Sequence, residues 1–468
     1  MFEVTHCGLD VELLPSPIAS LMPDAPGRIR CTCALDLAAA GEPVRCADFI
    51  LYRLLQVSAA TDGAGTPLAF RERLHAVDGL RDMQVNAIEV QFPVPIAPGE
   101  RRTLRLSYEG PLVGYREVMP YVHDAVLRDI ALLRPEILWY PVAGRAGADI
   151  VRRAAGTPPF EAVVRGPEGW WAAMAGARRE PDAAADPGVM AHFRGVNWSE
   201  GFFLVAGRYG ERAAGEHFVA HHLPGHEAWA ERAAEAARFA AATLTGWLGP
   251  RAARGERLDL VEIPEHWGSQ STPGLIMEIY REDPEHLFVE IAHEVSHGWT
   301  PGVDPNRFCD EGVAHYLETR LVGARFGEEA RRSAVDHQRR WLLAHPEAAR
   351  IPIAHAAEYP DHRDSVARRK GPLALAVLNA CVGDEAMWDL LRGWIRSADA
   401  PQAKATAADF CTHVRGWARE HGTLEADRFL QEWFEAPGTP PLGDAEDRAI
   451  AEVVGVWAAR YGSTERPA

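Results

Sequence analysis

The pattern of hydrophobic residues changes character once along the chain, near Gly210. Before this point, short apolar or alternating runs such as RIRCTCALDL and NAIEVQFPVPI are separated by turns rich in proline and glycine. Such runs are typical of an antiparallel sandwich or barrel. After Gly210 the chain is rich in alanine and has apolar residues at helical spacing, with RLDLVEI and GLIMEIY as further strand-like runs. The sequence therefore predicts an α+β protein with more than one domain.

The change in pattern also predicts where the domains divide. The chain has 468 residues, a length that suits two or three domains. We place an N-terminal antiparallel β-sandwich domain at residues 1–212. A mostly helical domain with a small mixed sheet is expected at residues 213–468.

Composition narrows the possible partners. Hydrophobic residues make up 47% of the chain and charged residues 25%, which are ordinary values for a soluble globular protein. The formal net charge of -17 argues against nucleic acid or an anionic membrane surface as a partner. The N-terminal residues lack the pattern of a signal peptide, no run of about 18 apolar residues occurs, and the cysteines are scattered. We therefore expect a cytoplasmic protein.

One predicted helix carries two closely spaced histidines. Asp283 and Pro284 form a favourable helix start, and Gly298 is a plausible stop, so we expect a helix from Glu285 to His297. His293 and His297 are four residues apart and lie on one face, where both imidazoles can reach one ion. Glu294 follows the first histidine, and its carboxylate can hold a water bound to that ion. This is the His-Glu-x-x-His arrangement of zinc peptidases.

These few residues alone are also compatible with a surface helix that carries neutral histidines. A third ligand would decide between the two interpretations, because a catalytic zinc takes three protein ligands and keeps one position open. The downstream candidates are Asp310, Glu311, His315 and Glu318.

We select Glu311 as the third ligand. Asp310 has the character of an N-cap, and Glu311 would then begin the second helix, with Gly312 allowing a close approach to the first. His315 and Glu318 share the face of Glu311 one and two turns further on, where they can orient the ligands.

The segments HEVSHGW and DEGVAHYLE together resemble the M1 family of zinc aminopeptidases, gluzincins with a thermolysin-like catalytic domain. In that family the His-Glu-x-x-His motif is followed by a glutamate in an Asn-Glu-Gly-Phe-Ala segment. The connecting loop is shorter here, but the Glu-Gly-x-Ala-x-Tyr context matches Glu311. The resemblance implies one zinc ion on His293, His297 and Glu311, with Glu294 as general base.

The resemblance extends over most of the chain. LRPEILWYPVAG and FEAVVRGPEGWWAAMAG are similar to the N-terminal β domain of bacterial M1 proteins. RFLQEWFEAPGTPPLG is similar to the segment that closes their catalytic domain. We expect a short form that lacks the large C-terminal helical domain of many relatives.

The chain departs from the family pattern at the segment that captures the substrate's free amine. The family has Gly-x-Met-Glu-Asn beside the zinc, and its glutamate binds the ammonium group. Alignment to the segment from Gly268 to Leu275 implies Gln270, Ser271 and Gly274 as substrate-binding residues. Ser271 replaces the glutamate, and a neutral serine supplies no charge for an ammonium group. Glu278 or Asp304 could compensate, and a plain turn and strand is the alternative.

A second departure concerns the tyrosine whose hydroxyl steadies the oxyanion in the family. Arg368 occupies that place before Lys370 and Gly371. Arginine is a cation and can stabilise an oxyanion, so we assign Arg368 a catalytic role. Tyr359 or His362, just upstream, could also reach in. The alternative is that Arg368 only pairs with an acid on the surface.

The preferred function is a zinc-dependent peptide hydrolase that resembles an aminopeptidase and acts on short peptides. A substrate would lie along GLIMEIY as an edge strand, through backbone hydrogen bonds. Ser271 weakens the expected preference for free N-termini. The alternative is a binding or scaffold protein that keeps the zincin fold without catalysis, since both substrate-side motifs are altered. Glu294 speaks against that alternative, because a protein without hydrolytic activity has little use for it.

Overall fold

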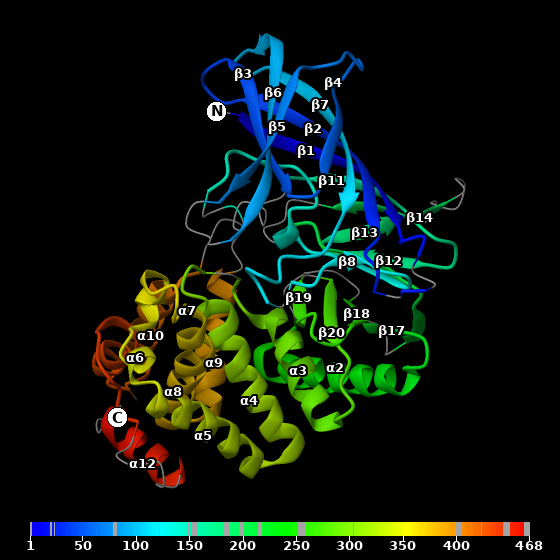
Figure 1. The fold of residues 1–468 in the computed structure, drawn as a ribbon. Helices are drawn as coiled ribbons and strands as arrows, with labels where there is room; N and C mark the ends of the chain where they lie inside the picture. The colour runs from blue at the N-terminus through cyan, green and yellow to red at the C-terminus, as the bar shows by residue number, and fades with distance from the viewer. Residues whose placement is uncertain are drawn as a thin grey trace. The chain divides into compact units, whose positions relative to one another are not determined.

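The structure is a computed structural model, and many of its helices and strands are labelled in Figure 1. It describes residues 2–18, 21–22, 24–77, 82–120, 122–147, 150, 158–180, 188–195, 201–213, 218–250, 258–272, 274–302, 304–398, 405–422, 424–442 and 450–462.

The chain divides into two compact units. The first comprises Met1–Glu231 and Gly255–Tyr280, and the second comprises Arg232–Arg254 and Arg281–Ala468. The described sheets lie in the first unit and most of the helices in the second. The predicted α+β class, a β-rich N-terminal part followed by a helical part, is therefore confirmed. The sequence boundary after residue 212 stays a prediction.

A seven-stranded sheet forms the larger layer of the N-terminal sandwich, in the order β13-β14-β11-β1-β2-β7-β4. All its pairs are antiparallel except β1 with β11. The strands alternate buried and exposed residues, as expected for a sheet with one face toward a core. The bounds are β1 Phe2–Leu14, β2 Arg28–Ala39, β4 Gln56–Asp62, β7 Arg101–Pro111, β11 Phe160–Arg165, β13 Ala177–Glu180 and β14 Val189–Gly195.

A four-stranded antiparallel sheet, in the order β10-β3-β6-β5, forms the second layer. One hydrophobic core joins the two sheets: Val11 and Leu106 of the larger sheet belong to the same buried cluster as Phe49 and Val90 of the smaller. Burial of such side chains from water is the main stabilising contribution to a sandwich of this kind. The bounds are β3 Val44–Tyr52, β5 Phe70–Ala76, β6 Gln84–Ile96 and β10 Val142–Ala143.

Two further sheets complete the first unit. The order is β12-β15-β9-β8 in one and β16-β17-β18-β20-β19 in the other. A second core, which includes Leu132 and Val205 as well as Val261 and Met277, joins them. The bounds are β8 Ala125–Val126, β9 Ile130–Leu133, β12 Trp171–Met174, β15 Leu204–Gly207, β16 Gly210–Ala213, β17 Phe218–His222, β18 Leu258–Ile263, β19 Gln270–Thr272 and β20 Leu275–Ile279, with the short helix η1 at Pro135–Ile137.

The five-stranded sheet corrects one expectation from the sequence. The run GLIMEIY was expected to be an edge strand, but β20 within it pairs with β18 on one side and β19 on the other. The edge strand on that side of the sheet is β19, which holds Gln270 and Ser271. Sequence pattern marks a strand but not its neighbours, because pairing is decided by residues distant in the chain.

The second unit is built from helices. The boundary between the units falls within α2, after Glu231. No helix in the described ranges combines the length and apolarity that a membrane crossing requires. The bounds are α2 Glu227–Leu248, α3 Pro284–Ser296, η3 His297–Trp299, η4 Phe308–Gly312, α4 Val313–Phe326, α5 Glu328–Ala344, α6 Pro346–Ala349, η5 Ile353–Glu358, α7 Arg363–Ser365, η6 Val366–Lys370, α8 Gly371–Val382, α9 Asp384–Ala398, α10 Ala407–His421, α11 Ala426–Leu430, η7 Gln431–Glu435 and α12 Ile450–Tyr461.

Helix α4 is central to the second unit, because it packs against α3, α5 and α8. Glycines allow the close approach to α8: the Cα of Gly312 would lie 3.1 Å from a β-carbon at Gly371. A β-carbon at Gly312 would lie 2.8 Å from a ring carbon of Phe308 and 3.3 Å from the carbonyl oxygen of Ala367. Gly312 therefore permits packing against the segment from η6 to α8, and not against the first histidine helix as the sequence suggested.

Candidate metal centre

Helix α3 and the 3₁₀ turn that follows it present the two predicted histidine ligands. The Asp283 carboxylate accepts a hydrogen bond from the Glu285 N–H at 3.0 Å, so the predicted N-cap is confirmed. A cap of this kind stabilises a helix by about 1 kcal/mol. The α-helix runs from Pro284 to Ser296, and His297 begins the 3₁₀ turn η3. The expected helix from Glu285 to His297 is therefore correct to within one residue at each end. The apolar face of α3 is buried at Leu287, Phe288, Ile291 and Val295.

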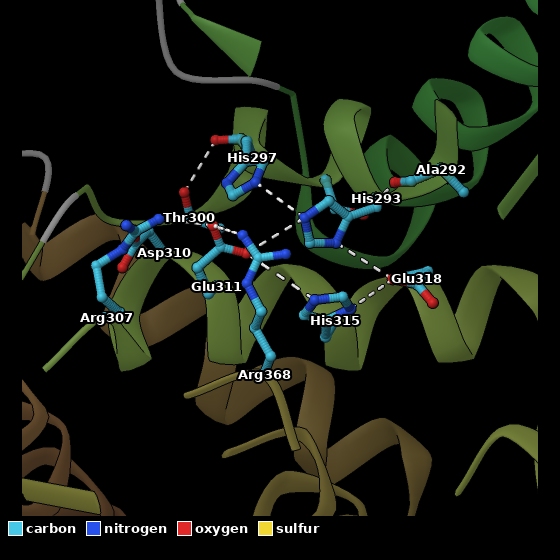
Figure 2. A network of polar contacts seen from close by, with 11 residues as sticks. Ala292, His293, His297, Thr300, Arg307, Asp310, Glu311, His315, Glu318 and Arg368 are labelled. Atoms are coloured by element: carbon cyan, nitrogen blue, oxygen red, sulfur yellow. Dashed lines mark hydrogen bonds and ion pairs between the residues drawn. The ribbon is translucent and has the colours of Figure 1, made fainter. Parts of the chain in front are cut away.

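The two imidazoles meet at their Nε2 atoms. His293 Nε2 lies 3.2 Å from His297 Nε2, and the ring planes are 87° apart. Two neutral imidazoles that turn lone pairs toward each other repel, so this approach requires a proton or a cation between them. His293 and its neighbours are shown in Figure 2.

Glu311 completes the predicted trio. Its Oε2 lies 3.4 Å from His293 Nε2, and one ligand atom from each of His293, His297 and Glu311 lies within 4.8 Å of the others. Four donors placed tetrahedrally around zinc at about 2.0–2.1 Å are about 3.3 Å apart. The two measured separations match that spacing. The Oε2 atom is also buried and has no hydrogen-bond partner among the described residues. The residues therefore fit a zinc ion.

His315 and Glu318 form a second group around the same histidine. Glu318 Oε2 accepts a hydrogen bond from His315 Nδ1 at 2.7 Å and lies 3.2 Å from His293 Nδ1. Although burial opposes ionisation, the two histidines lower the pKa of Glu318 to about 2. These three residues could also hold a cation by distance alone. The 2.7 Å separation is that of a hydrogen bond rather than of two ligands on one ion. The Glu318 carboxylate thus lies on the Nδ1 side of His293, while Nε2 of the same ring faces Glu311.

Glu294, the predicted general base, is buried beside the trio. It is 7% exposed, and its Oε2 has no hydrogen-bond partner among the described residues. Burial raises the pKa of Glu294 to about 7, against the opposing positive charges of His293 and Arg368. A carboxylate with this pKa can accept and return a proton near neutral pH.

Arg368, the predicted oxyanion residue, contacts the proposed ligand itself. Its Nη2 donates to Glu311 Oε1 at 3.0 Å, and its side chain is 49% exposed. Figure 2 shows Arg368 reaching Glu311 from η6. The alternative from the sequence, that Arg368 pairs only with an acid on the surface, is therefore wrong. The acid is Glu311, at the metal centre. A catalytic role for Arg368 stays a prediction.

Arg307 was missed by the sequence analysis. Its Nη2 donates to the same Glu311 Oε1 at 2.6 Å, and its Nε donates to Asp310 Oδ2 at 2.6 Å. The spacing of three and four residues between Arg307 and these acids could have indicated the contact. Asp310 itself is not the N-cap that the sequence suggested. It lies inside the π-helical turn η4, and Arg307 holds its carboxylate.

Other residues named from the sequence lie elsewhere in the second unit. Tyr359 follows η5, and its side chain is 42% exposed. His362 precedes α7, and its carbonyl oxygen accepts from the Val366 N–H. Asp304 accepts hydrogen bonds from the N–H groups of Asn306 and Cys309, so its carboxylate is used within the loop. A catalytic role for Tyr359 stays a prediction.

The predicted substrate-binding residues belong to the first unit. In β19, Gln270 pairs with Met277, and Ser271 pairs with Ile276. Gly274 adopts a φ of +83°, a backbone conformation that residues other than glycine rarely adopt. Their roles in substrate binding stay predictions. Nearby, the buried carboxylate of Glu278 accepts a hydrogen bond from Ser269 Oγ at 2.6 Å.

No protein-family model matches the sequence, and no curated protein does. The structure is more informative. An M1 zinc metallopeptidase from Deinococcus radiodurans, solved as a mutant bound to a Tyr-Ser-Ala substrate, matches 95% of this chain over 96% of its own, with a TM-score of 0.60 and 20% identity. The chain has the fold of the two-domain M1 zinc metallopeptidases.

A larger protein of known structure is also similar. Native yeast LTA4 hydrolase matches 97% of this chain over 70% of its own, with a TM-score of 0.66 and 14% identity. The chain thus spans nearly all of the two-domain M1 structure and about two thirds of the yeast protein. The M1 resemblance noted in the sequence is confirmed for the fold.

Proposed function

We propose that the chain is a zinc-dependent peptide hydrolase, with one zinc ion held by His293, His297 and Glu311. The observation that carries this proposal is the spacing of the donor atoms. His293 Nε2 lies 3.2 Å from His297 Nε2 and 3.4 Å from Glu311 Oε2, and those separations suit neighbouring ligands of one ion. The M1 fold supports the same proposal.

When bound, zinc would lower the pKa of a water molecule and polarise a substrate carbonyl. Glu294 would supply the proton transfers. Its buried carboxylate, with a pKa near 7, takes a proton from the attacking water and returns it to the leaving amine. One residue serves both steps because burial makes its charged and neutral forms similar in free energy.

Short peptides are the proposed substrates. The D. radiodurans M1 metallopeptidase mutant was solved with a Tyr-Ser-Ala substrate, which supports peptides of that size here. An extended peptide could pair with the edge strand β19 through backbone hydrogen bonds. Backbone pairing of this kind contacts few side chains of the substrate, so we propose that peptides of varied sequence are accepted.

A binding protein without catalysis is the second candidate, and the contact between Arg368 and Glu311 favours it. That arginine stands where M1 enzymes have their oxyanion tyrosine, and one of its N–H groups is engaged by Glu311. Glu294 favours catalysis, because it is not one of the proposed ligands and yet is kept buried beside them. Burying an acid without a partner costs free energy, which a purely structural site has no reason to incur. We therefore prefer the hydrolase.

One experiment separates the two candidates. The purified wild-type protein and the Glu294→Gln variant are analysed for bound zinc and incubated with a library of short peptides. We expect one zinc per chain in both, with cleavage by the wild type and a loss of about 10²–10⁴-fold in the variant. His293→Ala should lose both zinc and cleavage. Zinc binding without cleavage by the wild type would favour the binding protein, and equal cleavage by Glu294→Gln would refute Glu294 as the base.

A further inference from the structure

Glu311 is held differently at its two carboxylate oxygens. Oε2 faces His293 and has no hydrogen-bond partner among the described residues. Oε1 accepts hydrogen bonds from two guanidinium groups, Arg307 at 2.6 Å and Arg368 at 3.0 Å. Figure 2 shows both arginines at this carboxylate. One oxygen is therefore occupied by cations, and only the other is free for a metal ion.

The backbone at Arg307 is unusual for a residue with a large side chain. Its φ of 61 and ψ of 10 lie in the left-handed region, which costs a non-glycine residue about 1–2 kcal/mol. Glycine or asparagine would fit this conformation at lower cost. The surrounding backbone keeps it in place, because the Arg307 carbonyl accepts the N–H groups of both Glu311 and Gly312. In this conformation the Arg307 side chain lies beside the two acids that follow it, at positions 310 and 311.

The side chain of Arg307 bridges two consecutive buried acids. Its Nε donates to Asp310 Oδ2 and its Nη2 to Glu311 Oε1, so one guanidinium offsets the repulsion between neighbouring carboxylates. Asp310 is 4% exposed and Glu311 is 5% exposed. Arg368, which is 57 residues from Glu311 in the chain, adds a second donor to the same oxygen. The planar, rigid guanidinium fixes the plane of a carboxylate in a way that an ammonium group cannot.

We propose that Arg307 and Arg368 are positioning residues that hold Glu311 by Oε1, so that it binds the metal through Oε2 alone. This inference rests on the proposed zinc site. A carboxylate that is free to rotate can offer both oxygens to an ion, which raises the coordination number and uses the position that a substrate needs. The two guanidinium groups prevent that rotation. Arg368 thus acts through Glu311, in addition to any contact with substrate.

The test compares the metal-bound proteins without measuring turnover. The variants are Arg307→Asn, which tolerates the left-handed backbone but lacks the guanidinium, Arg368→Gln, and the double variant. Each is loaded with cobalt(II), whose visible absorption reports the coordination number, and zinc affinity is measured by competition with a chelator. We expect the double variant to show weaker absorption from a higher coordination number. We also expect its zinc dissociation constant to rise about tenfold or more.

Two controls make the outcome decisive. Arg332→Gln removes an exposed arginine that pairs with Glu328, and it should match the wild type in spectrum and affinity. Arg307→Lys keeps a positive charge beside Asp310 but lacks the planar guanidinium group that reaches both acids. It replaces Arg307→Asn in the comparison if the asparagine variant fails to fold. Unchanged spectra and affinities in the variants of Arg307 and Arg368 would overturn this inference but leave the proposed function standing. A wild type that binds neither cobalt nor zinc would instead overturn the proposed function.

Discussion

The Nε2 atoms of His293 and His297 face each other at 3.2 Å. In the metal-free protein, burial and the charge of His293 lower the pKa of His297 to about 3. Burial opposes a charge on His293 as well, but the carboxylates of Glu311 and Glu318 raise its pKa to about 10. At neutral pH His293 is therefore charged and His297 neutral, so zinc must displace the proton on His293 Nε2 to bind there.

Zinc binding should therefore release a proton. At pH 8, His293 of the metal-free protein is charged, and a protonated nitrogen cannot coordinate a metal. We expect at least one proton to be released per zinc bound: one from His293, and a further one to the extent that a zinc-bound water ionises at pH 8. Titration calorimetry in two buffers of different ionisation enthalpy measures this number. A value near zero would mean that His293 is neutral before zinc binds, which would contradict the assigned charge state.

Activity should depend on the ionisation of Glu294. Only the carboxylate form can accept a proton, and burial raises its pKa to about 7 in the metal-free protein. A nearby zinc ion favours the carboxylate, so kcat/KM should rise with pH along a limb at or below about 7. Because the charge of Arg368 lowers the pKa of Glu294, Arg368→Gln should move this limb to higher pH. A limb that stays in place would show that Arg368 does not act on Glu294.

Removal of the Glu318 carboxylate should weaken zinc binding. Glu318 lies 3.2 Å from His293 Nδ1, where its negative charge supports the position of that ring. Glu318→Gln should therefore lower zinc affinity by about 10–100-fold, the usual effect of losing such a partner. Competition with a chelator measures the change. Glu329→Gln, at an exposed position of α5, is the matched control and should leave the affinity unchanged.

The sequence predicted the histidine helix well because its signals are local. Asp283 caps α3, apolar spacing defines its buried face, and a four-residue spacing brings His293 and His297 together. None of these depends on distant parts of the chain. Helical spacing alone did not distinguish Glu311 from the other downstream acids. The match of Glu311 came from the Glu-Gly-x-Ala-x-Tyr context around it. The β-rich and helical parts were likewise predictable, since the period of apolar residues differs between strands and helices.

Other features depend on contacts that the sequence does not reveal. Arg368 and Glu311 are 57 residues apart, so their contact follows only from the packing of η6 beside η4. The spacing of Arg307 from Asp310 and Glu311 suits a contact, but Arg307 was missed because the left-handed backbone that begins this π-helical turn is not predictable for an arginine. The assignment of GLIMEIY as an edge strand was wrong because strand order is set by pairing across the sheet.

Lys370 should be important for stability. It is fully buried, and its Nζ donates to the carbonyl oxygens of Ala349 at 2.8 Å and Ile351 at 2.7 Å. Lys370→Met would leave both carbonyls without this donor, so we expect a loss of about 2–5 kcal/mol in the free energy of unfolding. Urea denaturation measures the change. Arg340→Gln, which removes a side chain that is 61% exposed, should cost less than about 1 kcal/mol.

Ser271 offers a test of amine recognition. A neutral serine cannot supply the charge that an ammonium group of a substrate requires, so the wild type should cleave free and N-acetylated peptides at similar rates. Ser271→Glu would place a carboxylate on the edge strand β19. If this position corresponds to the amine-binding glutamate of M1 enzymes, the variant should prefer the free peptide by roughly tenfold or more, equivalent to a charge-assisted hydrogen bond of about 1.5–3 kcal/mol. The ratio of kcat/KM for paired free and acetylated peptides measures this preference, with Ser271→Gln as the uncharged control. A strong preference already present in the wild type would mean that another acid binds the amine.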